Sequence, residues 1–547
     1  MRYFLFTVSS LFLYIRPTFS QHDSSYIRAF TIPLYSEKNN LYDSYLNEKD
    51  RNEHSSIKPY LNSPALNAIT DSIAQSMAGS NDNRLSKVKD RNQRSKGMLA
   101  VNGIFTTEVG YEQAAKVENK FLVEGGLSVQ AAYKNKLAFY STFLSGSSAF
   151  PSYLDSSIKH TIVIPGMGSA YAMNHGYSYQ YYSGYLSYSL NKIFNFQVGK
   201  DKHFWGEGYR SLLLSDVSNP FPFIKLSATV WKLKYVSLFA NLKDVENPSG
   251  LHKDFVNKYG TFHYLSWNAS KRLNISFFES IIWQGTDSNR VRKFDVNYLN
   301  PMIFYRPVEY SLGSSDNALL GFSYKIKVGK KCRQQFYGQI VIDEFLLKEV
   351  LAIFKKAAHP FDHTIQYGWW GNKQGVQFGF KDFDLFTVKN LNFQTEINAV
   401  RPYTYSHGSV LQNYSNYNQP LAHPLGANFA ESVSFLNYRY KRWIAGAECL
   451  YAVYGKDENG LNYGGNIFES YMTRPTNMDY GNKFFQGLRT NLMYTQLKLC
   501  YYVLPLSDLL AEAGLGLRQE KNSAAAVTST YFFIGIKTAL MNRYRDY

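Results

Sequence analysis

Cysteine is scarce in this chain of 547 residues, which contains three. Cys332, Cys449 and Cys500 are odd in number and lie far apart in the sequence. A disulfide framework needs paired cysteines, and a structural zinc site needs cysteine or histidine ligands at short spacings. The cysteine pattern therefore supports neither a disulfide scaffold nor a bound metal.

Long apolar runs are also scarce. Phe4–Ile15 is apolar but is shorter than the roughly 20 residues of a membrane-spanning helix. It follows a basic residue, and the small residues Thr18 and Ser20 precede Gln21 at the spacing of a signal-peptidase site. We expect residues 1–20 to be a cleavable signal peptide. Beyond them no apolar run reaches about 18 residues, which argues against a helical membrane protein.

Charged residues make up 18% of the chain, below the roughly 25% of ordinary soluble domains. Aromatic residues reach 17%, with 45 Tyr, 39 Phe and 7 Trp. Abundant tyrosine is typical of boundaries between apolar and aqueous surroundings, where membrane barrels carry aromatic girdles. The net charge of +17 falls to +15 without Arg2 and Arg16. This balance suits anionic partners such as acidic polysaccharide or lipopolysaccharide phosphate, or a general electrostatic preference of the lumen.

Catalytic motifs are missing. The sequence has no G-x-S-x-G, no H-E-x-x-H and no glycine loop that would cradle a phosphate. His407 and Ser409 lie close together at a loop entrance, but no third partner completes a triad. The histidines are scattered without metal-ligand spacing. We predict a non-enzymatic protein with no catalytic residue, no cofactor and no metal.

Residues 21–98 are polar and nearly balanced in charge. Apolar residues recur at helical spacing along Leu66–Met77, which predicts a short amphipathic helix. The charged stretch Asn81–Lys96 follows as a linker. We predict a small, partly helical periplasmic segment that packs near the opening of the next domain.

From about residue 99 the periodicity becomes two. Along Leu391–Ala399, for example, Phe393 and Ile397 alternate with Gln394 and Glu396, so that one face suits lipid and the other suits water. A soluble β-sandwich would alternate in the same way, so alternation alone does not separate the two architectures.

The lengths of the connections between strands distinguish a membrane barrel from a soluble β-sandwich. Eighteen strands are predicted to begin near residues 99, 122, 137, 177, 193, 223, 235, 259, 272, 317, 332, 366, 390, 433, 443, 487, 509 and 528. Short turns tend to alternate with long loops, and the long loops lie at 146–176, 201–222, 285–316, 344–365, 400–432 and 455–486. A transmembrane barrel with a periplasmic amino terminus shows this asymmetry. We therefore predict an all-β fold, an antiparallel transmembrane β-barrel of about 18 strands over residues 99–547, located in the cell outer membrane.

The carboxyl-terminal stretch Tyr531–Tyr547 is predicted to be the last strand, with apolar residues on one face and an aromatic end. Pairing of this strand with the first one would leave no open edge, which the lipid core requires.

Two long loops concentrate polar and aromatic residues, as ligand sites do. In Gly199–Asp216 two rings could stack on a sugar and three polar side chains could hydrogen-bond it, and Arg401–Phe429 offers a second set. The guanidinium groups of Arg210 and Arg306 could also pair with the carboxylates of an acidic glycan, so Arg306 is included among the candidates. The candidate ligand-binding residues are His203, Trp205, Glu207, Tyr209, Arg210, Arg306, Arg401, Tyr403, Tyr405 and His407. The alternative, compatible with ligand binding, is that both loops fold inward and plug the lumen.

Several motifs also resemble known families. Phe204–Leu226 and Leu299–Gly321 are similar to the Wzi family of capsule-assembly outer-membrane proteins. Gly371–Phe383, Asn398–His407 and Tyr417–Phe429 look closer to the gliding-motility protein RemB. The resemblance covers roughly residues 50–547.

The resemblance implies an eighteen-stranded barrel with a periplasmic helical portion. In the Wzi family it implies a surface lectin that holds capsular polysaccharide, and in the RemB branch a role in gliding or adhesion beside type IX secretion. We expect a barrel that binds or anchors surface polysaccharide or supports gliding motility, with outer-membrane lipids, polysaccharide and gliding or type IX secretion components as partners and no nucleic acid. The rival is an anion-selective transport channel, because eighteen strands leave room for a water-filled pore.

Overall fold

The computed structural model describes residues 29–32, 34, 42–47, 53–63, 66, 97–113, 118–134, 136–245, 255–287, 290–291, 298, 316–344 and 346–547. The predicted signal peptide, almost all of the predicted helix Leu66–Met77, the linker Asn81–Lys96 and Arg306 lie outside these residues. Among the helices of the described part, none is long and apolar enough to cross a membrane.

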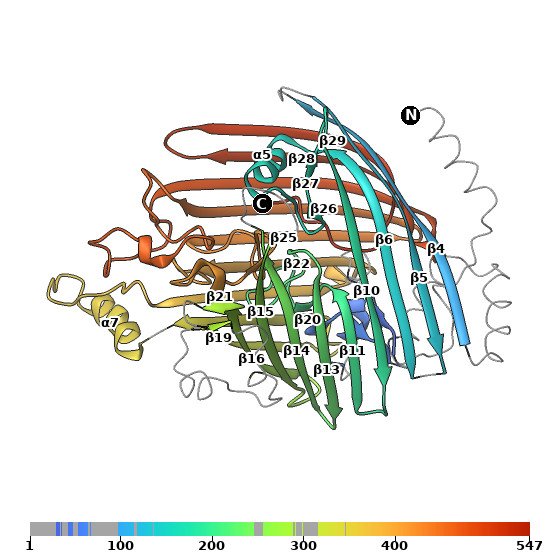
Figure 1. Ribbon diagram of the computed structural model, residues 1–547, viewed down its shortest axis with the longest axis horizontal. Helices are drawn as coiled ribbons and strands as arrows, with labels where there is room; N and C mark the ends of the chain where they lie inside the picture. Colours follow the sequence, from blue (N-terminus) through green and yellow to red (C-terminus); the bar gives the residue numbers. More distant parts are fainter. Residues whose placement is uncertain are drawn as a thin grey trace.

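Eighteen antiparallel strands form a closed barrel (Figure 1). Each strand pairs with its neighbours along the chain, and the last one, β29, closes the barrel on the first one, β4. The strands are β4 (Gly97–Gln113), β5 (Asn119–Tyr133), β6 (Leu137–Ala149), β10 (Tyr177–Ser189), β11 (Phe194–Asp201), β13 (Phe221–Val230), β14 (Leu233–Asp244), β15 (Val256–Trp267), β16 (Leu273–Gln284), β19 (Asn317–Val328), β20 (Gln334–Glu344), β21 (Lys373–Phe383), β22 (Leu391–Val400), β25 (Phe429–Tyr440), β26 (Trp443–Lys456), β27 (Leu488–Leu504), β28 (Leu509–Lys521) and β29 (Ala526–Thr538).

The predicted fold class and strand number are confirmed. The largest difference in a strand start is at β21, which was predicted near 366 and begins at Lys373. The aromatic residues before it belong to a loop instead. The backbone N–H of Trp370 donates to the carbonyl of Asp479, and the Trp370 ring lies 4.7 Å from that of Tyr471. This tertiary contact outweighs the local strand preference of the aromatic run.

Alternation along each strand separates a lipid face from a lumenal face. In β22, Ile397 is 55% exposed whereas its neighbours Glu396 and Asn398 are buried. In β20, Ile340 points outward whereas Gln339 is buried. The outward positions thus form the apolar surface that a bilayer requires.

A lipid-face substitution tests this assignment. Leu497, near the middle of β27, is 55% exposed, and its neighbour Gln496 lines the lumen. Leu497→Arg is expected to destabilise the barrel folded in bilayers by about 2–4 kcal/mol, because a cation then faces lipid. Gln496→Arg adds the same charge on the lumenal face and should cost less than Leu497→Arg in refolding titrations. Equal losses of stability in the two variants would contradict the assignment of Leu497 to the lipid face and of Gln496 to the lumenal face.

The two ends of the barrel differ. At one end, the short-turn end, tight connections such as Lys441-Arg442 join neighbouring strands. At the other, the long-loop end, extended segments join them, including 150–176, 202–220, 401–428 and 457–487. The long connections carry α5 (Ser152–Thr161) and α7 (Leu347–Ala358). This asymmetry agrees with the predicted alternation of short and long loops.

Segments from both ends of the chain lie inside the barrel. The short strand β2 (Ile57–Lys58) pairs in the lumen with β12 (Phe204–Trp205), which opens the 202–220 loop. At the short-turn end, His54 Nδ1 lies 2.9 Å from Ser266 Oγ on β15. The described parts of residues 29–63 therefore fill part of the lumen.

The carboxyl-terminal strand is shorter than predicted. β29 ends at Thr538, and residues 539–547, here called the tail, turn back into the lumen. The physical reason is charge. Arg543 and Arg545 find carboxylates inside the barrel, at Glu124 and Glu108, and a strand continued past Thr538 would leave these buried carboxylates without the two cations.

Candidate functional site

Trp205 lies in the interior of the barrel. Its side chain is fully buried, and its ring centroid lies 5.4 Å from that of Tyr264 and 6.0 Å from that of Phe278, on β15 and β16. Its backbone pairs with Ile57. The ring that was predicted to stack on a sugar thus packs between the lumenal wall and the amino-terminal segment.

His203 is equally enclosed. Its ring lies 4.6 Å from the ring of Phe223 and 5.8 Å from that of Phe221, and the residue is buried. Burial lowers the pKa of His203 well below its ordinary value, so its imidazole is neutral.

Glu207 joins the 202–220 loop to two other parts of the chain. Its Oε1 accepts a hydrogen bond of 2.6 Å from the Ser55 hydroxyl and forms an ion pair of 3.1 Å with Lys325 on β19. Its backbone carbonyl accepts from the ammonium of Lys381 on β21, at 2.7 Å. The loop is therefore anchored both to the wall and to the amino-terminal segment.

Arg210 is the centre of a buried ionic network. Its Nη2 lies 3.2 Å from Glu431 on β25 and 2.7 Å from Asp546 in the tail, and the side chain has no exposed area. Burial alone would lower the pKa of Arg210, but the carboxylates of Asp546 and Glu431 outweigh it and hold the pKa well above its ordinary value. His423 Nε2, from the 401–428 loop, lies 2.8 Å from the same Glu431. Two loops, the wall and the tail thus meet in one ionic network, in which Glu431 contacts both Arg210 and His423.

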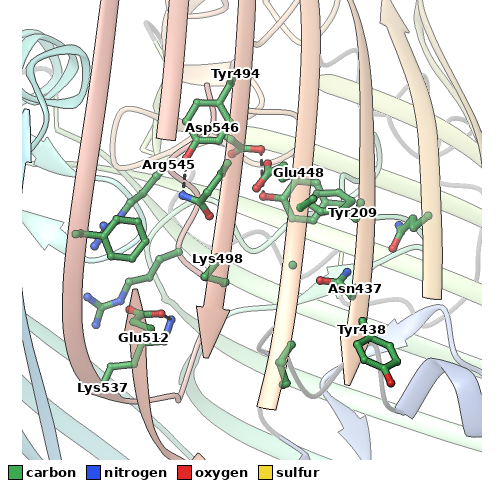
Figure 2. A pocket seen from close by; sticks show the side chains of 18 of the residues that line it. Tyr209, Asn437, Tyr438, Glu448, Tyr494, Lys498, Glu512, Lys537, Arg545 and Asp546 are labelled. Atoms are coloured by element: carbon green, nitrogen blue, oxygen red, sulfur yellow. Dashed lines mark hydrogen bonds and ion pairs between the residues drawn. The ribbon is translucent and has the colours of Figure 1, made fainter. Parts of the chain in front are cut away.

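Tyr209 differs from its neighbours because it borders open space. Its hydroxyl donates to Asp546 Oδ2 at 3.1 Å, and its ring lies 4.5 Å from the ring of Phe435 and 5.4 Å from that of Tyr544. The side chain forms part of the wall of an internal cavity (Figure 2).

The second predicted set binds neighbouring loops. Arg401 Nε donates to the carbonyl of Asn372 at 2.7 Å, and the Tyr403 hydroxyl donates to the carbonyl of Asn462 at 3.0 Å. The Tyr405 hydroxyl donates to the carbonyl of Leu212 at 2.7 Å, which joins the two long loops. Arg306 lies outside the described residues. The two sets meet through loop packing, and ligand contact by any of these residues stays a prediction.

His407 and Ser409 do not form a nucleophile–base pair. The Ser409 hydroxyl donates to Gln284 Oε1 at 2.9 Å, while His407 Nδ1 accepts from the backbone N–H of Ser409 at 3.3 Å. A triad requires the serine hydroxyl to donate to the histidine. Within the described ranges, no group of three or more His, Cys, Asp and Glu side chains could hold a metal ion.

A partly open cavity, in which the centres of water molecules can occupy about 190 Å³, lies in the lumen in the short-turn half of the barrel. Figure 2 shows side chains that line it. Inward side chains of β22, β25, β26, β27, β28 and β29 form its wall, and Tyr209 with the tail covers it. Sequence reasoning missed this site, although alternation already placed Asn392 and Gln394 on the aqueous face. What it could not supply was the tail, which bends back from the last strand.

The tail is held over the cavity by several polar contacts. Arg545 Nη1 lies 2.8 Å from Glu108 on β4, and Arg543 Nη2 lies 2.5 Å from Glu124 on β5. The Tyr544 hydroxyl donates to Asp216 at 2.6 Å. The tail therefore bridges the 202–220 loop and the first strands of the barrel.

Comparison with known proteins identifies the fold. No protein-family model and no curated protein matches the chain. Among solved structures, Wzi of Escherichia coli, described as a carbohydrate-binding β-barrel involved in group 1 capsule assembly, aligns with a TM-score of 0.54 at 11% identity, over 94% of this chain and 100% of Wzi. OccK1 (OpdK) of Pseudomonas aeruginosa aligns with a TM-score of 0.43 at 8% identity, over 80% of this chain and 98% of OccK1.

At such identities the likeness to Wzi concerns the fold alone. This chain has a Wzi-like fold, a closed barrel of eighteen antiparallel strands. The closed strand ladder and the apolar outer face are what a bilayer demands of a β-protein, because no backbone edge is left unpaired in lipid. The protein is an outer-membrane β-barrel.

Proposed function

We propose that this protein is a non-enzymatic outer-membrane barrel that binds or anchors surface polysaccharide. The observation that carries the proposal is the occupied lumen. A barrel of eighteen strands is wide enough for an aqueous pore. Here loops, the amino-terminal segment and the tail occupy that space, so the barrel serves as a rigid scaffold for the long loops rather than as an open conduit.

The occlusion reaches across the barrel. The 202–220 loop contacts β16 through Trp205 and β25 through Arg210. On the remaining side the tail pairs with β4 and β5 through Arg545 and Arg543. Together, ring packing at Trp205 and ion pairs at Arg210 and in the tail join opposite parts of the wall.

Wzi, whose fold this chain shares, is described as a carbohydrate-binding barrel. Other long loops keep exposed aromatic and polar side chains, such as Tyr367, Tyr480 and Asp479, and in the proposed orientation these face the cell exterior. The motifs similar to RemB extend the proposal to gliding or adhesion, with type IX secretion components as partners. Retention of polysaccharide at the surface would serve capsule assembly and adhesion alike.

A glycan array tests the proposal. Protein folded in detergent, with heat-modifiable migration on gels as the check of folding, is expected to bind polysaccharide or long oligosaccharides, and heat-unfolded protein should not. The same preparation is expected to show little steady conductance in planar bilayers, because the lumen is filled. A blank array together with large, stable, anion-selective channels would replace the proposal by the transport channel.

A further inference from the structure

Building on the proposed function, we propose that the lumenal cavity in the short-turn half of the barrel is a binding site for a neutral oligosaccharide segment. A glycan held there would enter through the short-turn end, the end predicted to face the periplasm. The cavity would then bind polysaccharide on the inner side of the plug, apart from the long loops.

The wall of the cavity is rich in side-chain amides. Asn392 and Gln394 on β22, Asn437 on β25 and Gln496 on β27 line it. Each amide both donates and accepts hydrogen bonds, as sugar hydroxyls do. Gln394 Nε2 donates to the Tyr337 hydroxyl at 3.0 Å, so this amide is held in place before a ligand arrives.

Aromatic rings border the same space. Tyr209, Phe435 and Tyr494 line the cavity, and Gln496 Nε2 donates to the Tyr494 hydroxyl at 2.8 Å. Figure 2 shows Tyr209 and Tyr494 beside Glu448 and Asp546 at one side of the cavity. Apolar rings with a few oriented polar groups are typical of sites for small organic ligands, sugar rings included.

The charges of the cavity favour a neutral ligand. Lys537 pairs with Glu512 at 2.7 Å, and Arg545 pairs with Glu108 at 2.8 Å. Arg543 is likewise paired with Glu124. These three cations are already compensated. Arg439 and Lys498 also line the cavity, together with the carboxyl groups of Glu448 and Asp546, so the wall carries little excess positive charge for an acidic glycan.

Two buried carboxyl groups lie beside each other at the cavity. Glu448 and Asp546 are hydrogen-bonded to each other, with one proton shared between the two carboxyl groups. Both residues line the cavity. Ligand hydroxyl groups that reach this pair would donate to its oxygens.

A steric variant with a matched control tests the site. Gly446 lies on the lumenal face of β26, opposite Lys498, and a Cβ atom there would meet Asn437 Oδ1 at 2.9 Å. Gly446→Phe therefore fills the cavity. Ala445→Phe adds the same ring to the outer face of the same strand.

Binding of maltohexaose, chitohexaose and mannohexaose to the full-length protein in detergent is measured by calorimetry, with hexagalacturonate as the acidic probe. We expect at least one neutral hexasaccharide to bind, Gly446→Phe to weaken its affinity at least tenfold, and Ala445→Phe to leave it unchanged. Stronger, cavity-dependent binding of hexagalacturonate would overturn the neutral class.

Unchanged affinity in a folded Gly446→Phe variant would overturn the cavity site and leave the proposed function intact. The same holds if no hexasaccharide binds although the glycan array is positive, whereas a blank array removes both proposals. If Gly446→Phe does not fold, the double variant Asn437→Leu and Gln496→Leu, which adds no ring, must show the same tenfold loss.

Discussion

The Arg210→Ala variant is expected to lose about 3–5 kcal/mol of stability in the plug and to conduct ions where the wild-type protein is silent. The substitution leaves Glu431 and Asp546 buried without the cation that they share. Breaking a buried ion pair from one side is costly because the remaining charge stays desolvated. Thermal melting followed by tryptophan fluorescence and planar-bilayer recordings measure the two effects.

Two further variants complete the test of the Arg210 network. Lys159→Ala removes an exposed ion pair with Asp155, which measures 2.6 Å, and should change stability by less than about 1 kcal/mol. Combining Arg210→Met with Glu431→Gln and Asp546→Asn removes all three charges and should restore much of the lost stability. An Arg210→Ala variant that melts like the wild type and stays closed would show that the network does not hold the plug.

Deletion of Met541–Tyr547 is expected to open the lumen without preventing barrel formation. The deletion removes the pairs of Arg543 with Glu124 and of Arg545 with Glu108, and it takes Asp546 from Arg210. The strand ladder itself survives, because β29 ends at Thr538 and its pairing with β4 lies before the deleted residues. Single-channel recordings should show steps of conductance that the full chain lacks.

A matched control replaces α7, at the long-loop end, by a short Gly-Ser linker. α7 contributes largely exposed residues such as Phe354, which is 67% exposed, so its loss should leave the lumen closed. If the truncated protein folds into a heat-modifiable barrel and remains electrically silent, the tail is not part of the seal.

The strands could be predicted from the sequence because their signal is local. Lipid on one side and polar lumen on the other impose alternation on every strand, as Ile397 between Glu396 and Asn398 shows. The start of β21 was misplaced because Trp370 resembles a strand residue but packs against a distant loop at Tyr471. Local pattern therefore fails where a long-range contact competes with it.

The candidate site was only partly predictable. Trp205, Glu207 and Arg210 have the chemistry of a glycan site, and the same chemistry also builds a buried plug. Which of the two it builds depends on partners far along the chain, such as Ser55 for Glu207 and Asp546 for Arg210. Residue type alone does not say whether a polar side chain faces a ligand or another part of its own chain.

By itself the sequence determined the barrel, its eighteen strands and their two faces, because each rests on hydrophobic contrast between adjacent residues. Only the tertiary structure decided that the tail turns inward at Thr538 and that the 202–220 loop crosses the lumen to meet it at Arg210. The physical reason is electrostatic. Buried charges are stable only beside their counter-charges, and closure of the barrel brings those counter-charges together from strands and loops that lie far apart in the chain.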